Sequence, residues 1–298
     1  MSKALFIKNK IKRFNKKIYV SGDKSLSIRW ILLASQANGK SKAYNLLMSE
    51  DVIAAINSIK KLGIKVNLYK NYCEILGNGI NGFRYKKNLT IDAKNSGTLG
   101  RLILGLLIKS PEKIRLIGDK SLSKRDFSRV TTPLKKFGAR FFYKTKNKLP
   151  LSILGSKNVK GIKYLENKGS AQCKSSIMLA ALNASGTTSI KAKKSRNHTE
   201  LLFKFLKIPI KIKKTKQYDF IDIKEPKKIR SFNYQIPGDI SSSAFFMVLT
   251  ILTKNSKLLI KNVNINSSRV GVITILKKMG AQILLKNQRN YRGEKISD

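Results

Sequence analysis

Long apolar runs, each preceded by a small polar cluster, recur along this chain at a spacing of about 70 residues. The clusters begin at Gly22, Asn95, Gly169 and Gly238. Runs apolar on all sides are typical of buried helices, so the chain is expected to contain buried helices at residues 102–108, 177–182 and 244–249.

A second type of helix is predicted between these runs. In residues 51–62, Val52, Ile56 and Ile59 fall on one face, and Gly63 follows as a stop signal. The Lys-Lys-apolar-Gly ending of this segment returns at residues 135–138 and 277–280, and residues 205–210 hold a degenerate copy without the Gly. The pattern predicts four copies of one unit with helices and strands, packed in layers in an α+β fold.

The charge is extreme, with 62 Lys and Arg against 16 Asp and Glu, a formal net charge of +46 over 298 residues. Such a balance points to an anionic partner, which could be a nucleic acid, a membrane surface or a phosphorylated substrate. The lysines are spread along the chain together with abundant Ile and Asn, so compositional bias explains most of the charge. Nucleic-acid binding is therefore not expected as the main function, since a clustered basic face is its footprint.

Cysteine and histidine are scarce. Cys73, Cys173 and His198 stand alone, without the ligand spacing of a zinc site. Isolated cysteines suit a reducing compartment, no apolar run reaches the length of a membrane span, and residues 1–5 lack the apolar core of a signal peptide. The expected location is the cytoplasm.

The polar clusters carry or adjoin cations, namely Lys24, Arg29, Arg101 and Lys174. Free N–H groups and partial positive charge at a helix start suit phosphate or carboxylate. Plain N-capping by Ser, Asn and Asp is the alternative for any one cluster, but four in register favour an anion site. The segment at Gly22 is no P-loop, because Asp23 precedes Lys24 and Ile18 occupies the place of the first glycine.

Seven motifs follow one another in order between Val20 and Ala281, at residues 20–29, 95–101, 122–134, 170–175, 195–200, 237–242 and 266–269. Together they resemble the signatures of the 5-enolpyruvylshikimate-3-phosphate synthase family. The resemblance implies six βαβαββ units in two domains. It also implies transfer of the enolpyruvyl group from phosphoenolpyruvate to the 5-hydroxyl of shikimate 3-phosphate, with release of phosphate and with neither a metal nor an organic cofactor.

The resemblance also assigns site residues. Shikimate 3-phosphate would contact Lys24, Ser25, Arg29, Ser170, Ala171, Gln172, Ser195 and Arg196. Phosphoenolpyruvate would contact Lys24, Asn95, Gly97, Arg125 and Gln172. Lys24 would stand where the two anions meet, as the one catalytic candidate, and planar arginines suit bidentate grips on carboxylate and phosphate. The role of Lys174 is left open.

Only four of the six repeats are recognisable. Residues 22–238 are predicted to form a complete three-repeat domain, and residues 1–21 with 239–298 part of a second. Because that second part holds one repeat of three, it is expected to expose apolar helix faces that neighbours would cover. The acid/base carboxylates of the family belong to the other two repeats, so we expect the chain alone to bind shikimate 3-phosphate weakly and to release little phosphate. A fragment, a split enzyme completed by a second chain and a decayed gene all stay open. The alternative function is a non-catalytic basic module for phosphorylated ligands or nucleic acid.

Overall fold

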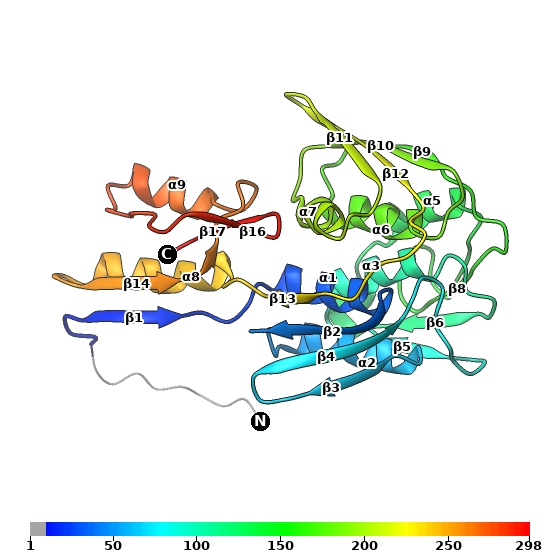
Figure 1. The fold of residues 1–298 in the computed structure, drawn as a ribbon, viewed down its shortest axis with the longest axis horizontal. Helices are drawn as coiled ribbons and strands as arrows, with labels where there is room; N and C mark the ends of the chain where they lie inside the picture. Colours follow the sequence, from blue (N-terminus) through cyan, green and yellow to red (C-terminus); the bar gives the residue numbers. More distant parts are fainter. Residues whose placement is uncertain (1–9) are drawn as a thin grey trace. The chain divides into compact units, whose positions relative to one another are not determined.

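The computed structural model describes residues 10–298, and the chain divides into two compact units. Unit 2 is Gly22–Ile236, and unit 1 joins Pro237–Asp298 to the segment that ends at Ser21 (Figure 1). The expectations for residues 1–9, which concern a leader peptide and the first part of the second domain, fall outside the described residues.

Unit 2 contains three four-stranded sheets with the same strand order. In each, the first pair is parallel and the other two pairs are antiparallel. The orders are β13-β2-β4-β3, β5-β6-β8-β7 and β9-β10-β12-β11. The strands are β2 (Asn38–Tyr44), β3 (Lys65–Leu68), β4 (Tyr72–Asn78), β5 (Thr90–Asp92), β6 (Ile114–Ile117), β7 (Arg140–Tyr143), β8 (Leu151–Leu154), β9 (Lys163–Glu166), β10 (Thr187–Lys193), β11 (Ile210–Lys214), β12 (Tyr218–Lys224) and β13 (Asn233–Gln235).

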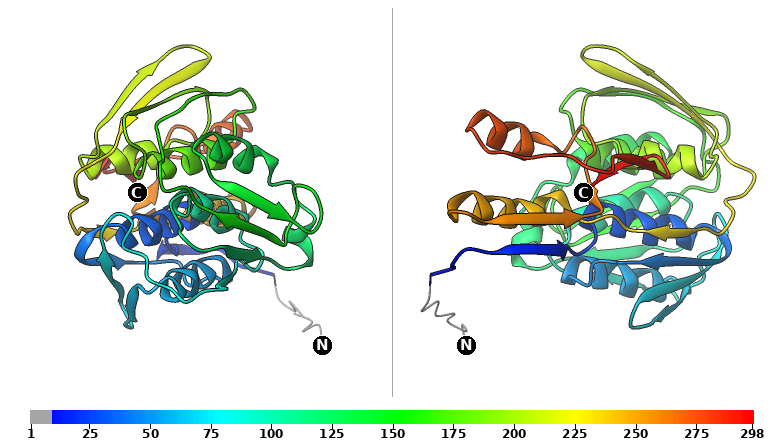
Figure 2. Two further views of the ribbon diagram at one scale, coloured as in Figure 1. Left: turned by 90° about the vertical axis from the view of Figure 1, so that its right-hand side faces the viewer. Right: turned by 60° about the vertical axis from the view of Figure 1, so that its left-hand side comes forward.

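The first helix of each repeat lies in the middle of unit 2, with the sheets outside (Figures 1 and 2). These helices are α1 (Lys24–Ser35), α3 (Gly97–Leu106) and α6 (Ala171–Ala181), and α3 packs against both of the others. The predicted buried helices at 102–108 and 177–182 are therefore confirmed, although α3 ends at Leu106. The remaining helices are α2 (Glu50–Lys61), α4 (Lys120–Ser123), α5 (Ser128–Lys136) and α7 (His198–Phe205).

Helix α2 has the predicted face. Val52, Ile56 and Ile59 are buried, and acidic Glu50 and Asp51 open the helix. Gly63 follows at φ +84°, and a Cβ there would lie 2.2 Å from the carbonyl oxygen of Arg84. Only glycine fits this turn, because the conformation and the close backbone both exclude a side chain.

Unit 1 holds the fourth copy of the pattern. Strand β1 (Asn15–Tyr19) pairs in parallel with β14 (Lys257–Lys261), as the first pair does in each sheet of unit 2. A separate small sheet has the order β15-β17-β16. The other elements are α8 (Ile240–Leu252), β15 (Val263–Asn264), α9 (Gly271–Lys278), β16 (Arg289–Tyr291) and β17 (Glu294–Ser297). Its core gathers Val20, Ile240, Ile260, Val263, Ile265 and Ile273.

The burial expected from the apolar run at 244–249 is not observed, whereas the exposed apolar helix face expected of residues 239–298 is present. Helix α8 forms, but Phe245 is 78% exposed and Leu252 is also 78% exposed, while Ile240 and Ser243 are the residues it buries. The physical reason is its surroundings, because within its unit α8 packs mainly against β14 and β15.

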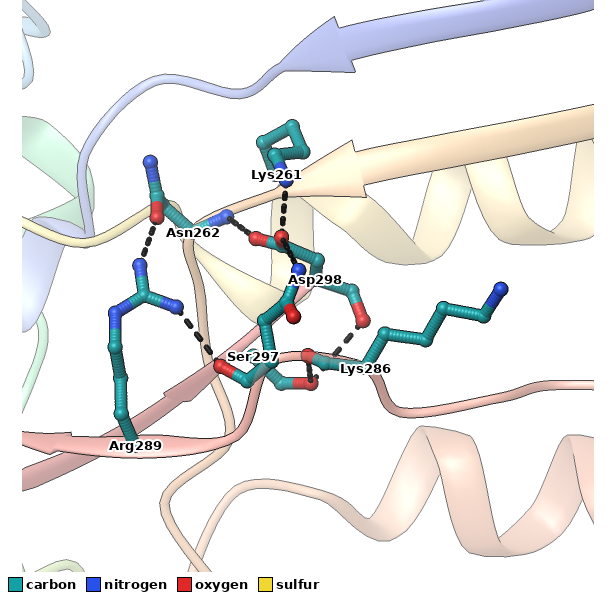
Figure 3. A network of polar contacts seen from close by, with 7 residues as sticks. Lys261, Asn262, Lys286, Arg289, Ser297 and Asp298 are labelled. Carbon is teal, nitrogen blue, oxygen red and sulfur yellow. Dashed lines mark hydrogen bonds and ion pairs between the residues drawn. The ribbon is translucent and has the colours of Figure 1, made fainter.

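The last strand of unit 1 is held by a polar network around Asp298 (Figure 3). The Asp298 carboxylate accepts hydrogen bonds from the backbone N–H of Asn262 at 2.9 Å and from Asn287 Nδ2 at 2.8 Å, and it pairs with Lys261. Burial alone would raise the pKa of Asp298, but the hydrogen bonds from Asn287 and Lys261 hold this pKa below its usual range. The carboxylate therefore stays ionised and ties β14 to the final strand.

Across residues 10–298 no helix is both long enough and apolar enough to cross a membrane.

Candidate functional site

Each of the four polar clusters supplies the N-cap of the helix that follows it. Ser96 and Ser170 accept hydrogen bonds from the N–H groups of Leu99 and Cys173, at the starts of α3 and α6. The caps of α1 and α8 are Asp23 and Asp239, which accept from Leu26 N at 3.0 Å and from Ser241 N at 2.7 Å. Each cap uses one of the free donors of its helix start, so a ligand would meet the remaining N–H groups and the side chains around them.

The buried side chain of Arg29 connects the start of α1 to the starts of α6 and α7. It is 4% exposed, and its Nε donates to Thr199 Oγ1 at 2.8 Å while its Nη2 donates to Ser175 Oγ at 3.0 Å. Its Nη1 donates to the carbonyl of Ser25 one turn earlier in α1. The guanidinium is thus fixed among α1, α6 and α7, with planar donors in one orientation.

A second polar link joins α3 to α6. Gln172 donates from Nε2 to Thr98 Oγ1 and accepts at Oε1 from Arg101 Nη1, both at 3.1 Å. Arg101 also lies 4.9 Å from the centre of the Phe127 ring. Burial, followed by the charges of Arg125 and Arg129, lowers the pKa of Arg101. Three arginines gathered in this way favour an anion beside them.

Arg101 is a candidate that the residue assignments by resemblance omit. Its motif, residues 95–101, is part of the sequence pattern, and the spacing of four residues from Gly97 places it one turn along the same helix. Its hydrogen bond to Gln172 spans 71 positions and could not be read from the sequence.

Asn95, Gly97 and Arg125 lie together at the start of α3. Arg125 Nη2 donates to Asn95 Oδ1 at 3.1 Å. A Cβ on Gly97 would lie 2.7 Å from Arg101 Nη1 and 3.2 Å from Arg125 Nη1. Glycine at this position therefore leaves room for two guanidinium groups against the backbone of the helix start.

The other predicted site residues lie at the starts of three helices. Lys24 begins α1, and its ammonium lies 3.4 Å from Asp51 Oδ2 with 46% of the side chain exposed. Ser170 and Ala171 begin α6, with Ser170 engaged as the cap. Ser195 and Arg196 precede α7, and the buried hydroxyl oxygen of Ser195 has no hydrogen-bond partner among the described residues. That hydroxyl can still donate to and accept from a ligand.

Lys174 has a partner that the sequence did not reveal. Its ammonium is fully buried in the first turn of α6 and lies 2.5 Å from Glu200 Oε1 in α7. The pair lies directly beside Ser175 and Thr199, which hold Arg29.

Metal and thiol chemistry find no support in the part of the chain that the structure describes. No group of three or more His, Cys, Asp or Glu residues could hold a metal ion within residues 10–298. Burial raises the pKa of both Cys73 and Cys173 to about 12, so neither is a nucleophile near neutral pH. What these helix starts offer is a set of cations, hydroxyls and backbone donors suited to anionic ligands.

Comparison with known proteins agrees with this chemistry. The family model described as EPSP synthase (3-phosphoshikimate 1-carboxyvinyltransferase) matches residues 8–296. A 3-phosphoshikimate 1-carboxyvinyltransferase of Thermoanaerobacter sp. (strain X514) is 40% identical over 294 residues, covering 98% of this chain and 68% of the relative. The enzyme of that name from Ruthia magnifica is 41% identical over 281 residues, covering 94% of this chain and 63% of the relative.

A solved structure of EPSP synthase from Acinetobacter baumannii superposes with a TM-score of 0.87 at 35% identity, covering 96% of this chain and 64% of that one. The chain thus spans about two thirds of the length of the relatives it matches. The repeated sheets, the capped helix starts and these matches together show that the chain belongs to the EPSP synthase family.

Proposed function

We propose that this chain serves the reaction for which its family is named, in which the enolpyruvyl group of phosphoenolpyruvate is transferred to the 5-hydroxyl of shikimate 3-phosphate. The C–O bond between C2 of phosphoenolpyruvate and its phosphate breaks, a bond from C2 to the 5-oxygen forms, and phosphate and a proton leave. The observation that carries the proposal is the meeting of α1, α3, α6 and α7 through Arg29, Arg101 and Gln172.

Each substrate is held by its own group of residues. Ser25, Arg29, Ser170, Ala171, Gln172, Ser195 and Arg196 hold shikimate 3-phosphate. Asn95, Gly97, Arg125 and Gln172 hold phosphoenolpyruvate, and Lys24 serves both substrates. The geometry of Arg125 favours its place among the phosphoenolpyruvate-binding residues. A guanidinium has five N–H donors, and the hydrogen bond to Asn95 leaves most of them available for a carboxylate or phosphate.

Unit 2 is proposed to be a complete domain of three repeats, because its three sheets share one strand order. Unit 1 is proposed to be part of a second domain. The two cysteines are both free and buried, which supports a reducing compartment and hence the cytoplasm as the location. No metal or organic cofactor is proposed.

The proposal is tested by titrating phosphoenolpyruvate into the 298-residue chain saturated with shikimate 3-phosphate. Arg125→Lys replaces the planar fork by a point charge, so affinity for phosphoenolpyruvate is expected to fall about tenfold or more. Arg140→Lys, at an exposed position of strand β7, is the matched control and should leave the affinity for phosphoenolpyruvate unchanged. Equal affinities in the wild type and Arg125→Lys would contradict the assignment.

The family match and the named relatives give no support to a non-catalytic basic module. The remaining test of that alternative is a salt titration with single-stranded polynucleotide. Binding that dominates over the two small substrates and falls steeply with salt would favour it.

A further inference from the structure

An ion pair lies buried behind Arg29. Lys174 is 0% exposed and Glu200 is 3% exposed, with Lys174 Nζ 2.5 Å from Glu200 Oε1. Among the described residues, neither the ammonium nor the carboxylate has a further hydrogen-bond partner. Each charge therefore depends on the other for its compensation.

The neighbouring residues form a second link between the same two helices. Ser175 follows Lys174 in α6, Thr199 precedes Glu200 in α7, and their hydroxyl oxygens lie 2.7 Å apart. Both hydroxyls accept from Arg29. The ion pair and the contact between the two hydroxyls lie side by side. Together they fix the position of the start of α6 relative to the start of α7.

Stability alone does not explain an ion pair at this place. Removing two charges from water is expensive, and a well-packed apolar pair of similar volume is commonly as stable or more so. Lys174 also lies in the first turn of α6, where the helix dipole disfavours a cation. What an ion pair adds over an apolar contact is a fixed geometry between two specific atoms.

We propose that the Lys174–Glu200 pair is a positioning device, which holds Ser175 and Thr199 in place so that Arg29 keeps the orientation it needs for an anionic substrate. The pair touches no ligand and acts through Arg29. This inference deepens the proposed function and rests on it for the identity of that substrate, shikimate 3-phosphate.

The test compares Glu200→Gln, Lys174→Met and the double variant. Each single substitution leaves one buried charge without its partner. The thermal midpoint of each single variant is therefore expected to fall by roughly 10 °C. The double variant removes both charges and should regain most of that loss. Glu200→Asp keeps the charge but shortens the side chain, and it is the second choice should the other variants fold poorly.

Two readouts separate positioning from stability. The first is hydrogen exchange of the Arg29 Nε–H, measured by NMR without ligand, which should accelerate at least about tenfold in the double variant. The second is the dissociation constant for shikimate 3-phosphate, which should rise about tenfold or more in the double variant and in Glu200→Asp, because a displaced guanidinium grips less well.

Leu179→Ala is the matched control. Leu179 lies in α6 and is buried, and it is not one of the hydrogen-bond partners of Arg29, which are Ser25, Ser175 and Thr199. It should lower the thermal midpoint while leaving substrate affinity unchanged in the folded protein.

The outcomes separate a failure of the positioning role from a failure of the proposed function. A stable double variant with wild-type Arg29 exchange and wild-type affinity would overturn the positioning role. A folded wild type that does not bind shikimate 3-phosphate would refute the proposed function, while the exchange of the Arg29 Nε–H would still decide whether the pair positions Arg29.

Discussion

Helices α6 and α8 look alike in sequence and differ in their surroundings. Both are apolar, and both begin with a polar residue that caps the helix, Ser170 and Asp239 respectively. Every residue of α6 from Cys173 to Ala181 is buried, whereas Phe245 and Leu252 of α8 are each 78% exposed.

The difference lies in what each helix packs against. Helix α6 contacts α3, α5 and strand β10, while α8 contacts mainly β14 and β15 within its unit. An apolar run therefore predicts that a helix forms and that it can be buried, but burial also needs neighbours. The neighbours that bury α6 in unit 2 also bring the candidate site residues together.

Thiol chemistry gives the largest expected contrast between the two helices. Burial raises the pKa of Cys173 in α6 to about 12, well above that of an ordinary thiol, so the neutral thiol persists until the pH approaches 12. At pH 8 its thiolate fraction is about a thousandfold below that of an ordinary thiol. Alkylation at pH 8, followed by mass spectrometry, should leave Cys173 unmodified.

The matched probe on α8 is Phe245→Cys, whose thiol should be alkylated at an ordinary rate. Modification of Cys173 in the folded chain at a comparable rate would show that α6 is not buried as described.

Side-chain truncation should separate the helices by stability. Met178 in α6 is 0% exposed, so Met178→Ala is expected to lower the free energy of unfolding of unit 2 by about 2–5 kcal/mol. The fluorescence of Trp30, the only tryptophan and fully buried in α1, reports this transition.

The corresponding change on α8 is Phe245→Ala, which should alter stability by less than about 0.5 kcal/mol. Hydrogen exchange of the backbone amides of β14 measures this change in stability. Exchange accelerated tenfold or more by Phe245→Ala would mean that α8 is covered in solution, and the contrast would fail.

Two glycines at helix starts, one in each unit, differ in what surrounds them. Gly97→Ala should push Arg101 or Arg125 aside, because the new methyl carbon would lie 2.7 Å from Arg101 Nη1 and 3.2 Å from Arg125 Nη1. We expect affinity for phosphoenolpyruvate, in the presence of shikimate 3-phosphate, to fall about tenfold.

Gly271 begins α9 in unit 1, and a Cβ there would meet nothing within 4 Å. Gly271→Ala should therefore leave the affinity at the wild-type value in the same titration. If Gly97→Ala binds phosphoenolpyruvate with wild-type affinity, then Arg101 and Arg125 can move away from the new methyl group without weakening binding.

The sequence predicted the parts that depend on near neighbours. The amphipathic face of α2, the glycine stop at Gly63 and the caps at Asp23 and Asp239 all follow from residues within a few positions of one another. Side-chain periodicity and capping act locally, which is why these elements could be placed in advance.

The contacts that join the site act over long separations in sequence. Arg29 and Thr199 are 170 positions apart, and neither the partner of Lys174 nor the link from Arg101 to Gln172 follows from any local pattern. The exposure of α8 does not follow from its apolar run, but it does follow from the repeat count, which leaves residues 239–298 with fewer neighbouring repeats than unit 2 has.

The helix starts of unit 2 are proposed to hold shikimate 3-phosphate. The most direct test of this proposal is a calorimetric titration of the 298-residue chain with shikimate 3-phosphate and, as control, with shikimate. We expect saturable binding of shikimate 3-phosphate at one site, binding of shikimate weaker by at least about tenfold, and a loss of affinity in Ser195→Ala, which removes a buried hydroxyl. Equal affinities for the two compounds, or no binding of shikimate 3-phosphate by a sample with a buried Trp30, would contradict the proposal.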